Sequence, residues 1–355
     1  MKIYKSYKPF ALECGQTLAE LQIAYHIYGN LNEERNNVIW IAHALTANSD
    51  AADWWSGLVG EGKLLDPKKY FIVCANMLGS SYGATNANSI DPKTKERYGK
   101  NWPIITVRDM VASHDILCKY LNINSIYLGI GGSMGGQQIL EWSISNPDLF
   151  ENTCLLASAA RAYPWSIAIN ESQRMALHAD QTLYLDTKNA GHAGMQAARS
   201  MALISYRNYV TYNKSQQDLT DEIGNYRVTS YQQYQGLKLS RRFLALSYLS
   251  ILHSMDSHNV GRNRGGIQNA LGLVRCKTLV IGIESDNLYP INEQVELANY
   301  IPNSTLKIIE SPYGHDGFLI ENEQIQTVIS RFLSPKKVTN NNLFNNNFQK
   351  KLQRV

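Results

Sequence analysis

Residues 130–136, Ile-Gly-Gly-Ser-Met-Gly-Gly, decide the fold of this chain. They follow a short apolar run, residues 125–128, that predicts a buried strand, and they precede the start of a predicted helix. A strand, a tight glycine turn carrying one serine, and a helix together are typical of a nucleophile elbow. Gly131 and Gly135 stand two residues before and after Ser133, where larger side chains would collide across the turn. We therefore expect Ser133 on a strained backbone, next to a helix N-terminus that can stabilise an oxyanion.

The same turn has two competing interpretations. It could be a glycine-rich connection in which the serine has no role, and only residues elsewhere in the chain can decide that. A phosphate-binding loop fits less well, because Gly-Lys-Ser/Thr is absent and Met134 stands where a dinucleotide fingerprint needs its third glycine.

The length and composition are typical of a large α/β domain rather than of a nucleic-acid-binding or membrane protein. The chain has 355 residues, of which 44% are hydrophobic and 18% charged. Its net charge of +4 comes from residues 336–355, which hold five basic and no acidic residues, so the rest is close to neutral. We therefore expect no nucleic-acid partner. No apolar run approaches the length of a membrane span, so we expect no membrane association.

The five cysteines are widely spaced and form no C-x-x-C pair, which favours a reducing compartment without disulfides or a zinc site. Residues 1–7 lack the apolar segment of a signal peptide, and we expect a cytoplasmic location. The stretch 253–258 contains two histidines and an aspartate, but it lacks H-E-x-x-H spacing and a fourth ligand. We expect it to pack at a domain junction, and we expect no metal site.

Apolar runs that predict buried strands alternate with helix-spaced segments along most of the chain. The strand runs are residues 38–42, 70–75, 125–128, 153–157, 278–283 and 305–309. An alternating run at residues 21–28 predicts a further strand that ends at a Gly-Asn turn. This order predicts an α/β fold with a mostly parallel sheet covered by helices.

The pattern changes between residues 161 and 266, where strand runs stop and helix-like stretches rich in Ala, Leu, Tyr and Gln take over. We interpret this segment as an inserted helical cap or lid. Residues 1–160 and 267–335 then form the core. Residues 336–355 are asparagine-rich and are expected to be disordered.

Three residues with catalytic chemistry follow predicted strands: Ser133, Asp286 and His315. Functional groups of open α/β sheets gather at the carboxyl ends of strands. The chain order Ser, Asp, His is that of α/β-hydrolase triads, so we predict an α/β-hydrolase fold with these residues as its triad. Singly, the aspartate could be a helix cap and the histidine a packing residue.

The roles follow from acid–base chemistry. Ser133 needs a base to become a nucleophile, His315 can take and return that proton, and Asp286 would orient the imidazole. The backbone N–H of Met134, directly after the nucleophile, is one expected oxyanion donor, and that of Leu45, in the loop after residues 38–42, is the other. His43 is expected to be a structural residue of that loop.

Several motifs in order resemble the homoserine O-acetyltransferase family, over about residues 18–333. They are Gly131-Gly-Ser-Met-Gly-Gly136, His43-Ala-Leu-Thr46, Asn76-Met-Leu-Gly79, Thr106-Val-Arg-Asp109, Ser205-Tyr-Arg207, Ser285-Asp-x-Leu-Tyr-Pro290 and Gly314-His-Asp-x-Phe-Leu319. The resemblance implies acyl transfer from acetyl-CoA, as a co-substrate, to the hydroxyl of L-homoserine through an acyl-serine intermediate. It also implies a cytoplasmic homodimer in methionine biosynthesis, with no cofactor.

The resemblance further implies that Arg199, Tyr206 and Asp316 hold the amino acid. Arg199 could clasp its carboxylate and Asp316 could pair its ammonium group, and Arg207 is a second candidate for the carboxylate. Residues 84–87, Ala-Thr-Asn-Ala, depart from the family's usual Thr-Gly-Pro-like turn. The acyl group could be acetyl or succinyl, and the acceptor homoserine or serine. The same triad would also serve an esterase or thioesterase, and the same fold could belong to a catalytically inactive binding protein.

Overall fold

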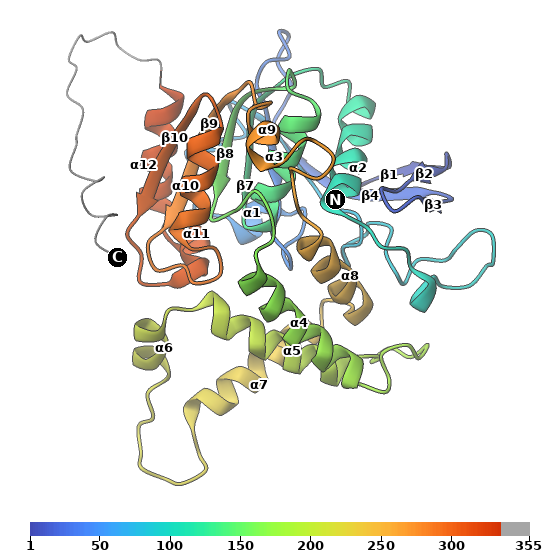
Figure 1. Cartoon of the computed structure of the whole chain (residues 1–355), viewed down its shortest axis with the longest axis vertical. Helices are drawn as coiled ribbons and strands as arrows, with labels where there is room; N and C mark the ends of the chain where they lie inside the picture. The colour runs from blue at the N-terminus through green and yellow to red at the C-terminus, as the bar shows by residue number, and fades with distance from the viewer. Residues whose placement is uncertain (335–355) are drawn as a thin grey trace.

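The computed structural model describes residues 1–334, so the expectations for residues 335–355 lie outside its described part. Its centre is an eight-stranded sheet (Figure 1). In spatial order the strands are β1 (Lys2–Ser6), β4 (Leu21–Tyr28), β6 (Phe71–Ala75), β5 (Val38–Ala42), β7 (Ile126–Gly132), β8 (Phe150–Leu156), β9 (Lys277–Ile283) and β10 (Ser304–Ile309).

The strands from β6 to β10 in this order are parallel, while β4 is antiparallel to both of its neighbours. The expected mostly parallel sheet is therefore confirmed. Strand β1 was not predicted, because it lies at the sheet edge with both faces largely exposed and carries little alternation. A separate small ribbon pairs β2 (Phe10–Ala11) with β3 (Thr17–Leu18).

Strand β5 shows why its sequence is a continuous apolar run. All five of its residues are buried, and successive side chains point to opposite faces of the sheet. Trp40 joins one apolar cluster, which includes residues of helices α2 (Val107–Tyr120) and α3 (Met134–Ser145). Ile39 joins a second cluster on the other face, which includes residues of helix α12 (Asn322–Leu333). Covering both faces requires apolar residues at every position.

The remaining core helices are short or lie at the sheet periphery. They are α1 (Ala51–Trp54), α9 (Ile267–Leu271), α10 (Ile291–Tyr300), α11 (Gly317–Ile320) and the 3₁₀ turns η1 (Gly99–Asn101) and η2 (Gly314–Asp316). The start of helix α2 is fixed by two residues of its own sequence. The Thr106 hydroxyl accepts from the Asp109 N–H, and the Asp109 carboxylate accepts from the Thr106 N–H, which forms a capping box.

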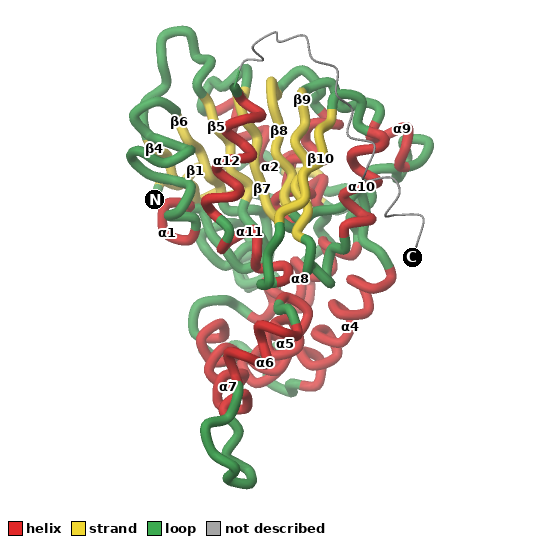
Figure 2. Tube along the Cα trace, turned by 90° about the vertical axis from the view of Figure 1, so that its left-hand side faces the viewer, coloured by secondary structure: helices red, strands yellow, loops and turns green. Residues whose placement is uncertain are grey.

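Between β8 and β9 every regular element is a helix. These are α4 (Pro164–Ala179), α5 (His192–Tyr206), α6 (Tyr209–Gln216), α7 (Arg227–Ser240) and α8 (Ala245–Asp256), followed by the short core helix α9. Figures 1 and 2 show α4 to α7 gathered beyond one end of the sheet. That end carries the carboxyl termini of the parallel strands, because Ser133 after β7 and Arg199 of α5 line one cavity. We call α4 to α8 and their connections the cap.

The two ends of the cap are fastened to each other and to the core by polar contacts. At the end of α8, Asp256 forms an ion pair with Arg174 of α4, and the His258 ring bonds the carbonyl of Ala159 at 3.1 Å. Within residues 1–334 no group of three or more metal-ligating side chains is assembled. The contacts of Asp256 and His258 place the stretch 253–258 at the junction between cap and core.

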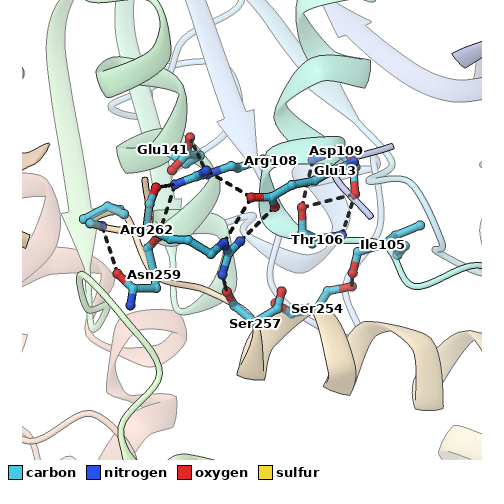
Figure 3. Close-up of polar contacts among 12 residues, drawn as sticks. Glu13, Ile105, Thr106, Arg108, Asp109, Glu141, Ser254, Ser257, Asn259 and Arg262 are labelled. Atoms are coloured by element: carbon cyan, nitrogen blue, oxygen red, sulfur yellow. Dashed lines mark hydrogen bonds and ion pairs between the residues drawn. The ribbon is translucent and has the colours of Figure 1, made fainter. Parts of the chain in front are cut away.

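A charged network holds the return segment from the cap against the core (Figure 3). Glu13 accepts bonds from Arg108 of α2 at 3.0 Å and from Arg262 at 2.8 Å. Arg108 also donates to the carbonyl of Arg262 at 2.6 Å, and Arg264 forms a bidentate pair with Glu141 of α3. The network thus ties the loop after α8 to the helix that follows Ser133.

None of the helices in the described part of the chain is long and apolar enough to cross a membrane.

Candidate active site

Ser133 stands at the turn between β7 and α3 with a strained backbone, φ 55° and ψ −126°. Such angles are costly for a residue with a side chain and require the surroundings to enforce them. A Cβ on Gly131 would lie 2.3 Å from the Gly135 carbonyl carbon, and one on Gly135 would lie 2.1 Å from the Ala42 oxygen. The two glycines therefore permit the close approach that the motif predicts, and they bring the loop after β5 against the turn.

Asp286 and His315 come together from the ends of two neighbouring strands. The carboxylate Oδ2 of Asp286 lies 2.7 Å from Nδ1 of His315. The other carboxylate oxygen accepts the backbone N–H groups of Leu288 and Tyr289, at 2.8 and 3.0 Å. This arrangement leaves Nε2 of His315 as the nitrogen available for proton transfer, and both Ser133 and His315 line the same cavity of about 470 Å³.

The electrostatics of His315 suit a base that works near neutrality. Burial alone disfavours the charged imidazolium, but the neighbouring Asp286 carboxylate outweighs this effect and, with Asp316, raises the pKa of His315. The ring is also enclosed by aromatic side chains, with centroids of Tyr289 and Phe318 at 5.4 and 5.3 Å. These contacts fix the orientation of the imidazole.

Of the two expected oxyanion donors, Leu45 lines this cavity, and Met134 directly follows Ser133, which also lines it. Met134 is the first residue of α3, where a backbone N–H has no intrahelical acceptor. Leu45 lines the cavity in the loop after β5. Within residues 1–334, neither N–H group donates to a backbone carbonyl outside the regular elements. The lack of such a partner is what the predicted role of an oxyanion donor requires.

His43, in the same loop, is a structural residue. Its Nδ1 lies 2.9 Å from the Ala44 carbonyl, and its Nε2 accepts the Met77 N–H at 3.2 Å. Complete burial lowers the pKa of His43 to about 4, so the ring is neutral at physiological pH. It joins the loops after β5 and β6, in agreement with the expectation from sequence.

The cap supplies two of the expected substrate residues. Arg199 and Tyr206, both on α5, line the cavity. The Arg199 guanidinium carbon lies 5.5 Å from the centroid of the Tyr206 ring, and that ring lies 5.7 Å from the ring of His315. Cation–π contact with Tyr206 holds the guanidinium beside the catalytic centre.

Asp316 also lines the cavity, but its charge is already partnered. Arg207 Nε lies 2.9 Å from Asp316 Oδ2, within ion-pair distance, although the geometry does not qualify as a hydrogen bond. Arg207 does not line the cavity, whereas Arg199 does. The structure therefore favours Arg199 over Arg207 as the group facing a substrate carboxylate, and it pairs Arg207 with one carboxylate oxygen of Asp316, which still lines the cavity.

Several cavity residues were not identified from sequence. Tyr82 lies in the loop after β6, Asp53 and Trp54 in α1, and Lys238 and Arg242 in and just after α7. None belongs to a motif of its own. The fold of the core brings the first three to this cavity, and the docking of the cap on the core brings Lys238 and Arg242. Residues 84–87, the departure from the family pattern, do not line this cavity. The side chain of Asn86 instead bonds the carbonyls of Ser80 and Ala84 and shapes the loop behind Tyr82.

Comparison with known proteins places the chain in a family. Residues 37–321 match the model of the alpha/beta hydrolase fold. A homoserine O-acetyltransferase of Cyclobacterium marinum is 42% identical over 93% of this chain and 94% of its own length. A homoserine O-acetyltransferase of Chlorobaculum parvum is also 42% identical, over 93% of each chain.

Solved structures show the same fold at lower identity. Esterase E22 superposes with a TM-score of 0.86, covering 94% of this chain and 99% of its own, at 20% identity. Homoserine O-acetyltransferase from Bacillus anthracis superposes with a TM-score of 0.87, covering 94% and 98%, at 23% identity. At such identities the structures support the fold alone, so the family rests on the sequence relatives. The chain belongs to the homoserine O-acetyltransferase family, within the alpha/beta hydrolase fold.

Proposed function

We propose that this protein transfers the acetyl group of acetyl-CoA to the hydroxyl of L-homoserine by a ping-pong mechanism, as a step of methionine biosynthesis. The activity is the one named for the curated relatives that are 42% identical. One observation carries the choice of an amino-acid acceptor. The cavity that contains Ser133 is also lined by a cation, Arg199, and an anion, Asp316, which match the carboxylate and ammonium groups of a zwitterion.

In the first half-reaction Ser133 Oγ attacks the thioester carbonyl carbon while His315 Nε2 takes the hydroxyl proton. The N–H groups of Leu45 and Met134 stabilise the tetrahedral oxyanion, and Asp286 stabilises the imidazolium. The carbon–sulfur bond then breaks, and His315 returns its proton to the departing CoA thiolate. The products are acetyl-Ser133 and free CoA.

The second half-reaction uses the same groups in reverse. The homoserine hydroxyl attacks the acetyl carbonyl carbon and gives its proton to His315. The bond to Ser133 Oγ breaks, and His315 returns the proton to that oxygen. Arg199 and Asp316 hold the acceptor so that its hydroxyl, rather than water, reaches the ester. The chemistry needs no metal or organic cofactor, and we expect chelators to leave activity unchanged.

The test follows free thiol released from acetyl-CoA, with and without homoserine. We expect rapid thiol release that requires homoserine, and no turnover in Ser133→Ala. Release that ignores the amino acid would instead establish a hydrolase, the activity named for structural neighbours such as esterase E22. Absence of turnover with any acyl donor would favour a binding protein. Parallel assays with succinyl-CoA and with serine decide which donor and which acceptor the enzyme uses.

We also propose a cytoplasmic homodimer. All five cysteines are free, four of them buried, which suits a reducing compartment. The cap exposes apolar side chains, including Tyr209 and Val210 on α6 and Leu219 and Ile223 beyond it, that a second subunit could cover. Cell fractionation tests the location. Light scattering tests the dimer, and a monomer at micromolar concentration would contradict it.

A further inference from the structure

Arg242 is a cap residue whose side chain reaches two loops of the core. It lies between α7 and α8, and its Nη1 donates to the carbonyl of Thr46 at 2.7 Å. The same nitrogen contacts the hydroxyl of Tyr82. Thr46 belongs to the loop after β5 and Tyr82 to the loop after β6. One guanidinium therefore bridges the cap to two of the core loops that border the Ser133 cavity.

Neighbouring contacts make this bridge a fixed attachment. The N–H of Leu244 donates to the Ser81 hydroxyl at 2.9 Å. The ring of the buried Phe243 packs edge-on against that of Tyr82, with centroids 5.6 Å apart. Residues 242–244 thus hold three consecutive contacts to the core, and the position of the Arg242 backbone is set independently of its own side chain.

The loop that Arg242 holds is the one that carries an oxyanion donor. Leu45 directly precedes Thr46, so only the φ and ψ torsions of these two residues separate the Leu45 N–H from the Thr46 carbonyl. Upstream the loop is fixed by His43, which bonds Met77, and downstream by the Asn48 carbonyl, which accepts from the Trp54 indole at 2.8 Å. Between these anchors the Ala47 N–H donates to the Ala44 carbonyl at 3.1 Å, and within residues 1–334 the Thr46 carbonyl has Arg242 as its hydrogen-bond donor.

We infer that Arg242 is a positioning residue for acylation of Ser133. From the cap it holds the loop after β5 so that the Leu45 N–H points at the developing oxyanion. Displacement of such a donor weakens the transition state without removing the nucleophile. The inference rests on the proposed function in taking Ser133 as nucleophile and Leu45 as oxyanion donor. It also gives the cap a part in the first half-reaction, besides binding the acceptor.

A different role for Arg242 would be attraction of the anionic part of CoA. Arg242 is exposed and lines the cavity with Lys238, and within residues 1–334 neither side chain has a carboxylate within ion-pair distance. Geometry favours positioning, because the guanidinium nitrogen already points at Thr46 and Tyr82. An acyl donor without phosphate groups distinguishes the two roles, because loss of Arg242 would slow acylation by such a donor only if Arg242 is a positioning residue.

The test measures the first-turnover release of p-nitrophenolate from p-nitrophenyl acetate, without CoA or homoserine. Its rate constant reports acylation, and its amplitude counts correctly folded sites. For Arg242→Ala we expect the rate constant to fall about 10- to 100-fold, somewhat less than loss of a whole oxyanion donor. We expect kcat/KM for acetyl-CoA to fall by the same factor and KM for homoserine to stay unchanged. Arg242→Lys, which retains one donor, should recover part of the rate.

The adjacent Arg241 supplies a matched control, because it is exposed and its side chain has no hydrogen bond or ion pair within residues 1–334. Arg241→Ala should acylate at the wild-type rate. Unchanged p-nitrophenyl acetate acylation in Arg242→Ala, with a raised KM for acetyl-CoA, would overturn the inference in favour of donor binding. A reduced amplitude with a wild-type rate constant would also overturn it, as a folding defect. Failure of the proposed function looks different: acylation would then persist in Ser133→Ala, or transfer would ignore homoserine.

Discussion

The Asp286 carboxylate lies 2.7 Å from Nδ1 of His315, although the two residues follow different strands and stand 29 positions apart. The second carboxylate oxygen is held by two backbone N–H groups, so the carboxylate cannot turn away. This pair fixes the histidine tautomer, and in the proposed mechanism it prepares His315 to accept a proton from Ser133. Catalysis therefore depends on how the groups around this pair are held.

Asp286→Asn should leave the fold intact and lower kcat by about 10⁴-fold, because the amide favours the wrong tautomer of His315. Steady-state assays with acetyl-CoA and homoserine measure the change. Circular dichroism and the melting temperature serve as the control for folding. A loss of less than about tenfold would show that another group orients His315.

The loss of activity at low pH should follow the protonation of His315. The neutral imidazole is the base, and its pKa is raised above the ordinary 6.5, so kcat/KM for acetyl-CoA should fall as pH drops through a midpoint above 6.5. Asp286→Asn removes the main cause of the rise and leaves the effect of burial, so the midpoint should move to lower pH. An acid limb unmoved by that substitution would assign the titration to another group.

Arg199→Ala should raise KM for homoserine about 10- to 100-fold, since a charge-assisted hydrogen bond contributes about 1.5–3 kcal/mol. Acylation of Ser133 by acetyl-CoA, followed by mass spectrometry, should be largely unaffected. Arg207→Ala is the comparison, because Arg207 contacts Asp316 and does not line the cavity. If Arg207→Ala raises KM more than Arg199→Ala does, the carboxylate assignment passes to Arg207.

Gly135→Ala should destabilise the protein, because its new Cβ would lie 2.1 Å from the Ala42 oxygen. Overpacking of this kind costs about 1–3 kcal/mol, occasionally more, in the free energy of unfolding. Urea denaturation measures it. Gly272→Ala is the matched control, with its nearest neighbours at 3.4 Å, and should be close to neutral. Equal stability of both variants would show that the turn can open.

Glu13→Gln should weaken the network that binds the return segment of the cap to α2 (Figure 3). Burial raises the pKa of Glu13, but hydrogen bonds and charge from Arg262 and Arg108 outweigh it and lower that pKa. The carboxylate therefore contributes stability above its ordinary pKa of 4.5 and loses it as pH falls through the lower folded value.

At pH 7 we expect Glu13→Gln to cost about 1–2 kcal/mol in the free energy of unfolding, in line with hydrogen bonds to charged groups. As pH falls below 4.5, towards the lowered folded pKa of Glu13, the difference from wild type should shrink. The exposed Glu33→Gln is the control and should show no such dependence. A pH-independent difference would mean that Glu13 acts through packing rather than charge.

The sequence by itself determined the fold class and the order of the candidate triad. Residues 130–136 require a strand, a turn and a helix, because only glycine tolerates the close approach around Ser133. The continuous apolar run of β5 requires a strand covered on both faces, because side chains alternate. These are local properties, fixed by periodicity and by the backbone freedom of single residues, so they can be identified without knowing the tertiary contacts.

Only the tertiary structure decided how the cap meets the core. Arg242 contacts Thr46 across 196 positions, and Arg207 lies against Asp316 rather than in the cavity that Arg199 lines. Nothing local in the sequence distinguishes Arg242 from the exposed Arg241 beside it. The contacts of a long side chain depend on how separate elements dock. That docking is determined by the burial of whole helix faces rather than by any single motif.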